Sequence, residues 1–372
     1  MKNLQTAFIA LHGFIHLIGF IKGWFPWQMP GENLAISKGS GILWLVTAGL
    51  FIAAAVAFHR VHAYWHILAV TGVILSLILV VVYWNYAKFG LIPNAIVVLF
   101  IVSALSACSL NKKIAEESKL VYAAAKQAQD EPITKDAIQH LPESVQKWLE
   151  ISGVVGRHPI NSVFLQQNFL MKLKPEQENW YRAEAKQLFS VHEPAFIWTV
   201  RVPMSSLITV RGRDRFYKGK GEMLMKMNSI IKLGNEKGSK MDEGTLQRFL
   251  GEIVWFPSAA LSSYITWERV ESNVAKATMK YGGTVGEGYF YFNDDGDIER
   301  YVANRYKGND TDAQKYDWIV RIIDYKEFEG VRIPVEMDAT WRLEEGDWTW
   351  CKITLTDVRY DVQPNQFNMS VK

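Results

Sequence analysis

Charge is distributed very unevenly along this chain. Only six Lys, Arg, Asp or Glu residues lie within the first 110 positions, although the whole chain has 41 basic and 38 acidic residues. That region contains four apolar runs without an internal charge, at residues 4–21, 41–58, 64–83 and 91–110. A helix needs about 20 mostly apolar residues to cross a bilayer, where an unpaired charge costs several kcal/mol. Residues 1–110 are therefore predicted to form a transmembrane bundle of four α-helices.

The Lys and Arg residues near the predicted spans suggest an orientation. An even number of spans places both chain ends on one side, which carries six such residues against three on the other. Because cytoplasmic loops carry an excess of Lys and Arg, the counts favour a cytoplasmic soluble part. We therefore predict a multi-pass protein of the inner cell membrane, and a periplasmic or extracytoplasmic soluble part is the alternative.

Histidines gather in the predicted membrane part. His12 and His16 are four residues apart, as are His62 and His66, so each pair shares one face of its helix. Two such pairs could bind a transition metal or haem. The alternative is that His12 and His16 form hydrogen bonds inside the bundle. Since no haem-attachment motif is present, the sequence predicts no metal and no cofactor.

The soluble part begins with a polar segment. Residues 111–158 are rich in Ala, Lys, Glu and Gln, which favour helix, and Pro132 and Pro142 interrupt them. They are predicted to form a helical stalk or linker. Residues 159–372 then alternate between apolar and polar with period two, which is typical of half-buried antiparallel strands. About eleven strands are expected, too many for a flat open sheet.

One segment of the soluble part has a helical period instead. Its apolar residues fall on a single helical face, which must be buried against the sheet. These residues are Leu246, Phe249, Leu250, Ile253 and Val254. The predicted fold of residues 159–372 is therefore an α+β domain, a strongly curved antiparallel sheet or half-barrel covered by a helix.

Two rows of side chains in this domain are candidates for ligand binding. Three methionines alternate along one predicted strand and would line one face with adaptable apolar groups, with core packing as the alternative. Three arginines alternate along the preceding strand and could meet an anionic headgroup or a carboxylate, with a solvated basic stripe as the alternative. Together with the helix and a tryptophan opposite it, the predicted ligand-binding residues are Met223, Met225, Met227, Phe249, Ile253, Trp267, Arg211, Arg213 and Arg215.

Catalytic and nucleic-acid motifs are missing from the sequence. It has no G-x-S-x-G nucleophile elbow and no H-E-x-x-H zinc motif. The protein is therefore predicted not to be an enzyme. A net charge of +3 without a basic cluster interleaved by aromatics predicts no nucleic-acid partner.

Two family resemblances extend this interpretation. The segments LHGFIHLIGF at 11–20 and AKFG at 87–90 resemble an uncharacterised bacterial family that joins a four-helix membrane segment to a C-terminal soluble domain. The segments GYFYFNDDG at 288–296, DYKEFEGVRIP at 324–334 and LTDV at 355–358 resemble the LolA/LolB-type lipoprotein-carrier fold. That resemblance implies an incomplete antiparallel barrel, closed by helices around an apolar cavity. Such carriers work outside the cytoplasm, so the side of the membrane stays open.

The expected function follows from this organisation. The β-rich domain is predicted to bind a membrane lipid or another hydrophobic, lipid-like ligand near the membrane, in a cavity with an apolar lining. One alternative is a membrane redox or metal protein that uses the histidine pairs. Another is a non-catalytic membrane scaffold that binds another protein, for which the sequence indicates no particular partner.

Overall fold

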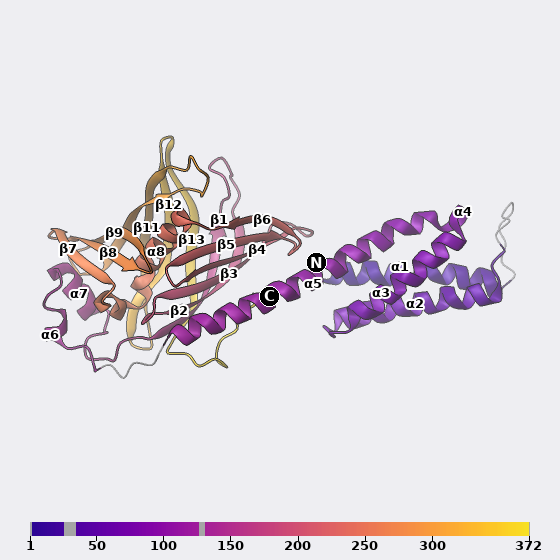
Figure 1. Cartoon of the computed structure of the whole chain (residues 1–372), viewed down its shortest axis with the longest axis horizontal. Coiled ribbons are helices and arrows are strands. Elements are labelled where there is room, and N and C mark those ends of the chain that lie inside the picture. The colour runs from indigo at the N-terminus through magenta and orange to yellow at the C-terminus, as the bar shows by residue number, and fades with distance from the viewer. Residues whose placement is uncertain (1, 26–34, 126–130, 372) are drawn as a thin grey trace. The chain divides into compact units, whose positions relative to one another are not determined.

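A computed structural model of the chain describes residues 2–25, 35–125 and 131–371 (Figure 1). The chain divides into two compact units, Met1–Ser109 and Leu110–Lys372. This division falls where the sequence changes from uninterrupted apolar runs to mixed polar composition.

The first unit is helical. Its described residues include four helices that are long and apolar enough to cross a membrane, which confirms the four predicted apolar helices. The helices are α1 (Lys2–Trp24), α2 (Lys38–His59), α3 (Trp65–Val82), and a fourth built from α4 (Trp84–Ala87), the 3-10 turn η1 (Lys88–Gly90) and α5 (Leu91–Ala124). From Leu110 on, α5 belongs to the second unit. Ile9, Phe51, Ala69 and Val97 belong to the buried apolar core of the first unit. Gly13 of α1 lets α2 approach closely, because a Cβ atom there would lie 3.1 Å from the Ala48 carbonyl oxygen.

The second unit is built on one antiparallel sheet of thirteen strands. The strands are β1 (Ser162–Met171), β2 (Tyr181–Ser190), β3 (Ala195–Pro203), β4 (Thr209–Tyr217), β5 (Lys220–Met227), β6 (Ile231–Glu236), β7 (Ile265–Glu271), β8 (Val274–Tyr281), β9 (Thr284–Phe292), β10 (Ile298–Tyr306), β11 (Lys315–Phe328), β12 (Val331–Leu343) and β13 (Gly346–Tyr360). Their order is β6-β5-β4-β3-β2-β1-β13-β12-β11-β10-β9-β8-β7. All neighbours except β1 and β13 are consecutive in the chain, so the sheet consists of two meanders joined at its centre.

The sheet is strongly curved but not closed. Its edge strands, β6 and β7, do not pair with each other. The β4–β5 and β8–β9 turns nevertheless touch, because Thr284 Oγ1 donates to the Gly219 carbonyl at 3.1 Å. A Cβ atom on Gly219 would lie 2.7 Å from the Gly282 Cα, and both glycines have positive φ. The predicted half-barrel is therefore confirmed as an open, curved sheet whose two arms meet at one end.

Helix α8 (Ser239–Glu252) covers the concave face of this sheet, between the two arms (Figure 1). It follows β6 and continues through the 3-10 turns η2 (Ile253–Trp255) and η3 (Pro257–Leu261) to β7. The predicted apolar face of this segment is buried in the main core, as expected for an amphipathic helix.

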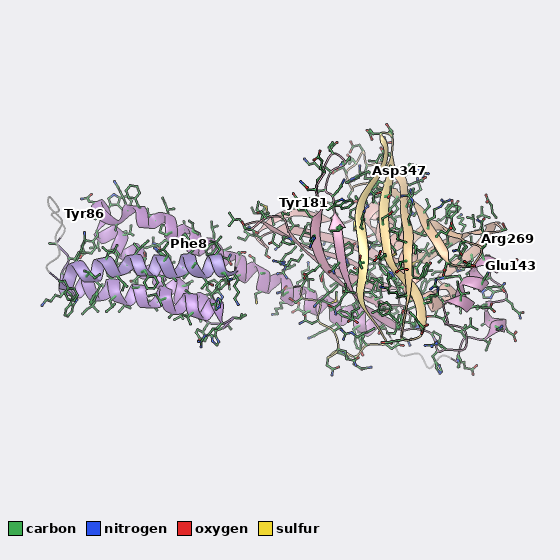
Figure 2. All side chains as sticks on the ribbon, turned by 180° about the vertical axis from the view of Figure 1, so that it is seen from behind. Phe8, Tyr86, Glu143, Tyr181, Arg269 and Asp347 are labelled. Atoms are coloured by element: carbon green, nitrogen blue, oxygen red, sulfur yellow. The ribbon has the colours of Figure 1, made fainter. Side chains whose placement is uncertain are left out.

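The segment predicted to be a linker belongs to the second unit. Helix α7 (Glu143–Ile151) lies beside β7 and β8, as the neighbouring positions of Glu143 and Arg269 in Figure 2 show. Among its side chains, Val145, Trp148 and Leu149 are buried in the same core as α8. Residues 131–158 are thus part of the folded domain rather than a free stalk, because their apolar side chains complete the core.

The outer face of the sheet is partly covered by the last turns of α5. Leu110, Ile114 and Val121 pack there with Leu224 of β5. The C-terminal tail joins them through Phe367, whose ring lies 5.9 Å from that of Tyr122. The second unit therefore has a small core on its outer face in addition to the main one under α8.

Candidate functional site

Four polar side chains form a buried network inside the helical unit. They come from three helices and are at most 3% exposed: His12 and His16 of α1, Ser76 of α3 and Asn94 of α5. His12 Nε2 lies 3.0 Å from Asn94 Oδ1, and His16 Nε2 lies 2.9 Å from Ser76 Oγ. Asn94 Nδ2 donates to Ser76 Oγ at 2.8 Å. An apolar bundle keeps such groups only where they satisfy one another or serve a ligand.

Donors and acceptors in this network have one consistent assignment with a single N–H on each ring. The His16 Nδ1–H donates to the His12 carbonyl at 2.8 Å, which leaves His16 Nε2 to accept from the Ser76 hydroxyl. Ser76 Oγ in turn accepts from Asn94, whose Oδ1 accepts from His12 Nε2–H. His12 Nδ1 is then a buried acceptor with no partner among the described residues.

A pocket of about 530 Å³ opens beside this network. His12, His16 and Ser76 contribute to its lining, and most of the remaining wall is apolar or aromatic, including Trp44 and Tyr83. The Trp44 indole N–H is also buried and has no partner among the described residues. The volume is within the range of small-molecule sites, and a mostly apolar wall with a few polar groups is their usual construction.

The alternative of a metal site was based on the two histidine pairs. No group of three or more His, Cys, Asp or Glu side chains in the described part of the chain could hold a metal ion. Both ring nitrogens of His16 are already engaged in the network. His62 stacks on Tyr64 at 5.3 Å, and the ring of His66 lies 6.3 Å from that of Trp65. The two histidine pairs therefore have separate protein partners.

The predicted ligand site of the β domain is filled by protein. Phe249 and Ile253 are both fully buried in the main core. Met223, Met225 and Met227 are half-buried on β5, and Met225 packs against that core. Trp267 lies on the edge strand at the far end of the sheet order, where its Nε1–H donates to the Ala260 carbonyl at 2.9 Å. The apolar face of α8 occupies the space that a ligand would need.

The arginine row of β4 faces the opposite side of the sheet. Arg213 is fully buried, with its guanidinium 3.0 Å from a Glu117 carboxylate oxygen of α5 and 3.1 Å from one of Glu222. Arg215 lies near the same two carboxylates, and Arg211 donates to Asn111 at 2.9 Å. The row therefore holds α5 against the sheet, and the carboxylates it meets belong to the protein.

These contacts also alter the Glu222 carboxyl. Burial alone would raise its pKa, but the hydrogen bond and charge of Arg213, with Lys237 and Lys113, lower the pKa to about 2. Glu222 therefore stays ionised at neutral pH and keeps its ion pairs with α5 and β4.

A second charged cluster lies under α8. Arg248 of that helix contacts Asp214 of β4 at 2.7 Å and Glu252 at 2.8 Å. Burial raises the pKa of both carboxyls, against the charge of Arg248. Burial also lowers the pKa of the neighbouring Arg305 to about 10. The charges of this cluster are paired with one another.

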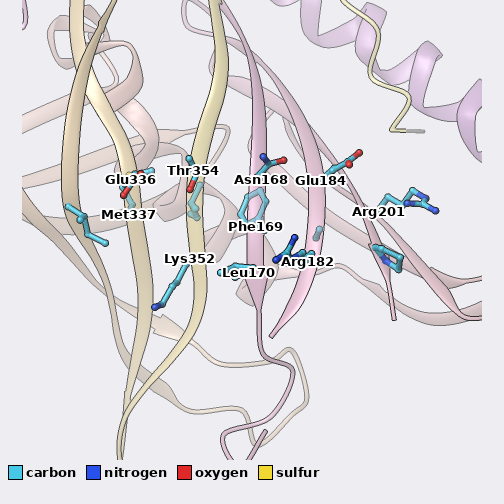
Figure 3. A pocket seen from close by; sticks show the side chains of 14 residues that line it. Asn168, Phe169, Leu170, Arg182, Glu184, Arg201, Glu336, Met337, Lys352 and Thr354 are labelled. Carbon is cyan, nitrogen blue, oxygen red and sulfur yellow. The ribbon is translucent and has the colours of Figure 1, made fainter. Parts of the chain in front are cut away.

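The outer face of the sheet has an open recess of about 560 Å³ (Figure 3). Arg201, Glu184, Asn168, Thr354 and Glu336 form one row across five neighbouring strands. A second recess of about 740 Å³ continues from it past Lys352, whose ammonium lies 5.3 Å from the Trp180 ring. Charged and polar side chains dominate the second recess, whereas apolar side chains such as Leu170, Pro203 and Ile323 form much of the first.

Sequence reasoning singled out the histidines but missed their partners. Ser76 and Asn94 stand out as polar residues within apolar runs, which was an available signal. Trp44 gave no such signal, because tryptophans are common near membrane interfaces. Trp44 and Ser76 line the same pocket as His12 and His16. Asn94 belongs to the hydrogen-bond network beside that pocket.

Two solved structures are similar to this chain at low sequence identity. A LolA superfamily protein from Nitrosomonas europaea is similar at 12% identity over 61% of this chain and 97% of that chain, with a TM-score of 0.34. A beta-barrel-like protein of the domain of unknown function DUF1849, from Brucella abortus, is similar at 12% identity over 55% of this chain and 100% of that chain, with a TM-score of 0.23. Both likenesses are distant. No curated protein matches the chain.

A family model gives a stronger match. It covers residues 131–353, which is more than half of the chain, and includes α7, α8 and nearly all of the sheet. The four apolar helices lie outside the matched region. This protein belongs to the family of unknown function DUF6544.

Proposed function

We propose that this chain is a non-catalytic membrane protein that binds a small lipid-like molecule in the pocket of its helical unit. The ligand has an apolar body and a hydroxyl or N–H group. The observation that carries this proposal concerns His12, which lines an apolar pocket of about 530 Å³. Its Nδ1 atom is a buried acceptor with no hydrogen-bond partner among the described residues.

The energetic reason concerns the buried lone pair. A buried acceptor without a hydrogen bond costs about 1–3 kcal/mol, and a ligand hydroxyl that donates to His12 Nδ1 recovers this cost. The Trp44 N–H is a second unsatisfied group on the same wall and suits the oxygen of such a hydroxyl. The apolar lining supplies affinity, and the polar pair supplies selectivity.

The proposal is tested with two probes of equal shape. Full-length protein in nanodiscs is dialysed against para-hexylphenol or its methyl ether, and uptake by empty nanodiscs is subtracted. The phenol is expected to bind about tenfold more tightly, equivalent to about 1.4 kcal/mol, because only the phenol can donate to His12. His12→Leu should remove this preference, whereas His66→Leu, outside the pocket lining, should keep it.

The parent protein alone can contradict the proposal. Equal binding of the phenol and its ether would mean that no acceptor is available in the pocket, whatever His12→Leu does to folding. A preference that survives in a well-folded His12→Leu protein would place the recognising group elsewhere.

Ligand binding inside the β domain is the second candidate and requires α8 to leave the sheet. The half-buried methionine row of β5 favours it, because these side chains are adaptable. Against it, the Met225 sulfur lies only 2.5 Å from where a Cβ on Gly212 would be, so the strands leave little spare room.

Met225→Trp distinguishes a packed interior from a cavity. In a packed interior the larger side chain is expected to lower the free energy of unfolding by about 1–3 kcal/mol. The measurement is urea unfolding of the full chain in detergent, together with uptake of a fluorescent fatty acyl probe. An unchanged unfolding midpoint with lost probe uptake would instead support a ligand cavity under α8.

A further inference from the structure

We propose that the second unit carries a surface that inserts into an anionic phospholipid bilayer, which goes beyond ligand binding in the helical unit. This surface, the apolar tip, consists of Leu207 and Ile208 in the β3–β4 loop and Ile231 and Leu233 of β6. Their exposed fractions are 64%, 39%, 53% and 54%. Clustered exposure of four branched aliphatic side chains is costly in water and marks an interaction surface.

Hydrogen bonds join the two segments of the apolar tip. The Asn228 side-chain amide donates to the Leu207 carbonyl at 3.0 Å, and its oxygen accepts from the Thr209 N–H at 2.9 Å. The Asn228 backbone N–H donates to the Thr209 carbonyl at 2.7 Å. The β3–β4 loop and the β5–β6 turn therefore form one structural unit at this end of the sheet.

Contacts between β4 and α5 show which residues of α5 lie nearest to the apolar tip. Arg211 of β4 contacts Asn111 of α5. Arg213 lies two residues further along β4 and contacts Glu117, which lies six residues further along α5. About 7 Å of strand thus runs beside about 9 Å of helix, in the same direction. Residues before Arg211 therefore lie toward Asn111, at the start of the part of α5 that belongs to the second unit. The apolar tip is thus at the same end of the second unit as the first polar residues of α5, which directly follow its apolar run in the sequence.

Charge on the neighbouring residues identifies the kind of bilayer. Lys226 pairs in register with both Arg211 and Lys232, and Lys112 is exposed where the polar part of α5 begins. The next residue, Lys113, faces Glu117 and Glu222 instead, at 3.9 and 3.7 Å. Each cation near an anionic membrane surface contributes about 1 kcal/mol. Glu236 lies on β6 toward its far end, opposite Met223, and so outside this group. Apolar side chains flanked by cations are the usual composition of a membrane-inserting surface.

Membrane contact would also cover an edge strand. Strand β6 is the first strand in the sheet order, so one of its sides has no strand partner among the described residues. Exposed edges with apolar side chains promote association with other chains unless something covers them. Lipid headgroups and acyl chains would cover the apolar side chains while the cations remain at the surface.

A fluorescent label at the apolar tip tests this proposal in the full-length protein. Leu207→Cys is made in a Cys108→Ala background and labelled with a polarity-sensitive fluorophore. The remaining Cys351 is 1% exposed, and burial raises the pKa of its thiol, so it should stay unlabelled. The matched control is Val285→Cys, which is 49% exposed and belongs to the β8–β9 hairpin that meets the far end of β4.

Both labelled proteins are placed in nanodiscs that contain phosphatidylglycerol, with or without bromine on the acyl chains. We expect the label at position 207 to shift to the blue and to lose most of its emission to brominated lipid, and the label at 285 to do neither. Water-like emission without quenching at position 207 would overturn the proposal. A blue shift without quenching would show that protein, such as a second copy of the chain, covers the apolar tip instead of lipid.

Discussion

Replacing Arg248 with Ala is expected to lower the free energy of unfolding of the β domain by about 3–5 kcal/mol. Arg248 lies between Asp214 and Glu252, with N–O distances of 2.7 and 2.8 Å. Without it, two buried carboxylates would face one another, and Arg305 and Arg213 would be the remaining cations near Asp214. Urea unfolding of the full chain in detergent, followed by tryptophan fluorescence, measures the change.

The loss should be smaller in acid. Burial already raises the pKa of Asp214 and Glu252, and removing Arg248 removes the charge that opposes this effect. The folded variant then binds more protons than the unfolded chain, so its stability rises as the pH falls through the raised pKa values. Arg269→Ala is the matched control, because Arg269 is exposed on β7 and should change stability by less than about 0.5 kcal/mol. Equal stability of the two variants would mean that the cluster under α8 is not buried as described.

Trp148→Ala should cost about 3–5 kcal/mol, as large-to-small changes of buried tryptophan usually do. Trp148 is 2% exposed, and its ring stacks against Phe290 of β9 at a centroid distance of 6.5 Å. The same substitution in a free linker would lower the free energy of unfolding by almost nothing. A large loss therefore indicates that Trp148 is packed in the core. The same unfolding measurement in detergent detects it.

Its control lies on the same helix. Glu150 of α7 is exposed and forms an exposed ion pair with Lys135 at 3.6 Å, so Glu150→Ala should cost less than about 1 kcal/mol. Similar, small losses for both variants would show that α7 does not complete the core of the domain.

The sequence predicted the large features whose signals are local. Four helices follow from four uncharged runs, and the burial of Phe249 and Leu250 follows from their helical spacing. The period-two alternation of residues 159–372 likewise indicated half-buried antiparallel strands. Each of these predictions needs only the residues of one element and its immediate neighbours.

What the sequence did not predict depends on contacts between distant elements. The sequence indicated no partner for the arginine row, because Glu117 lies about a hundred residues before Arg213. It belongs to a helix whose membrane-spanning part was predicted to end at residue 110. Buried Leu110, Ile114 and Val121 do fall on one face of that helix, and this spacing was the missed signal. For the bundle pocket, no periodicity could show that Asn94 meets His12, since their helices are not consecutive.

The pairing of β1 with β13 at the centre of the sheet has a consequence for folding. Each meander can form from neighbouring strands as the chain emerges, but the central seam joins residues about two hundred positions apart, such as Val163 and Tyr360. Closing so long a loop is slow, and until then β1 would expose an unpaired edge in mid-sheet. Assembly of the domain must therefore wait until β13 has been made, long after the four apolar helices. A chaperone that shields β1 during this interval would raise the yield of folded protein more than one that acts on the helices.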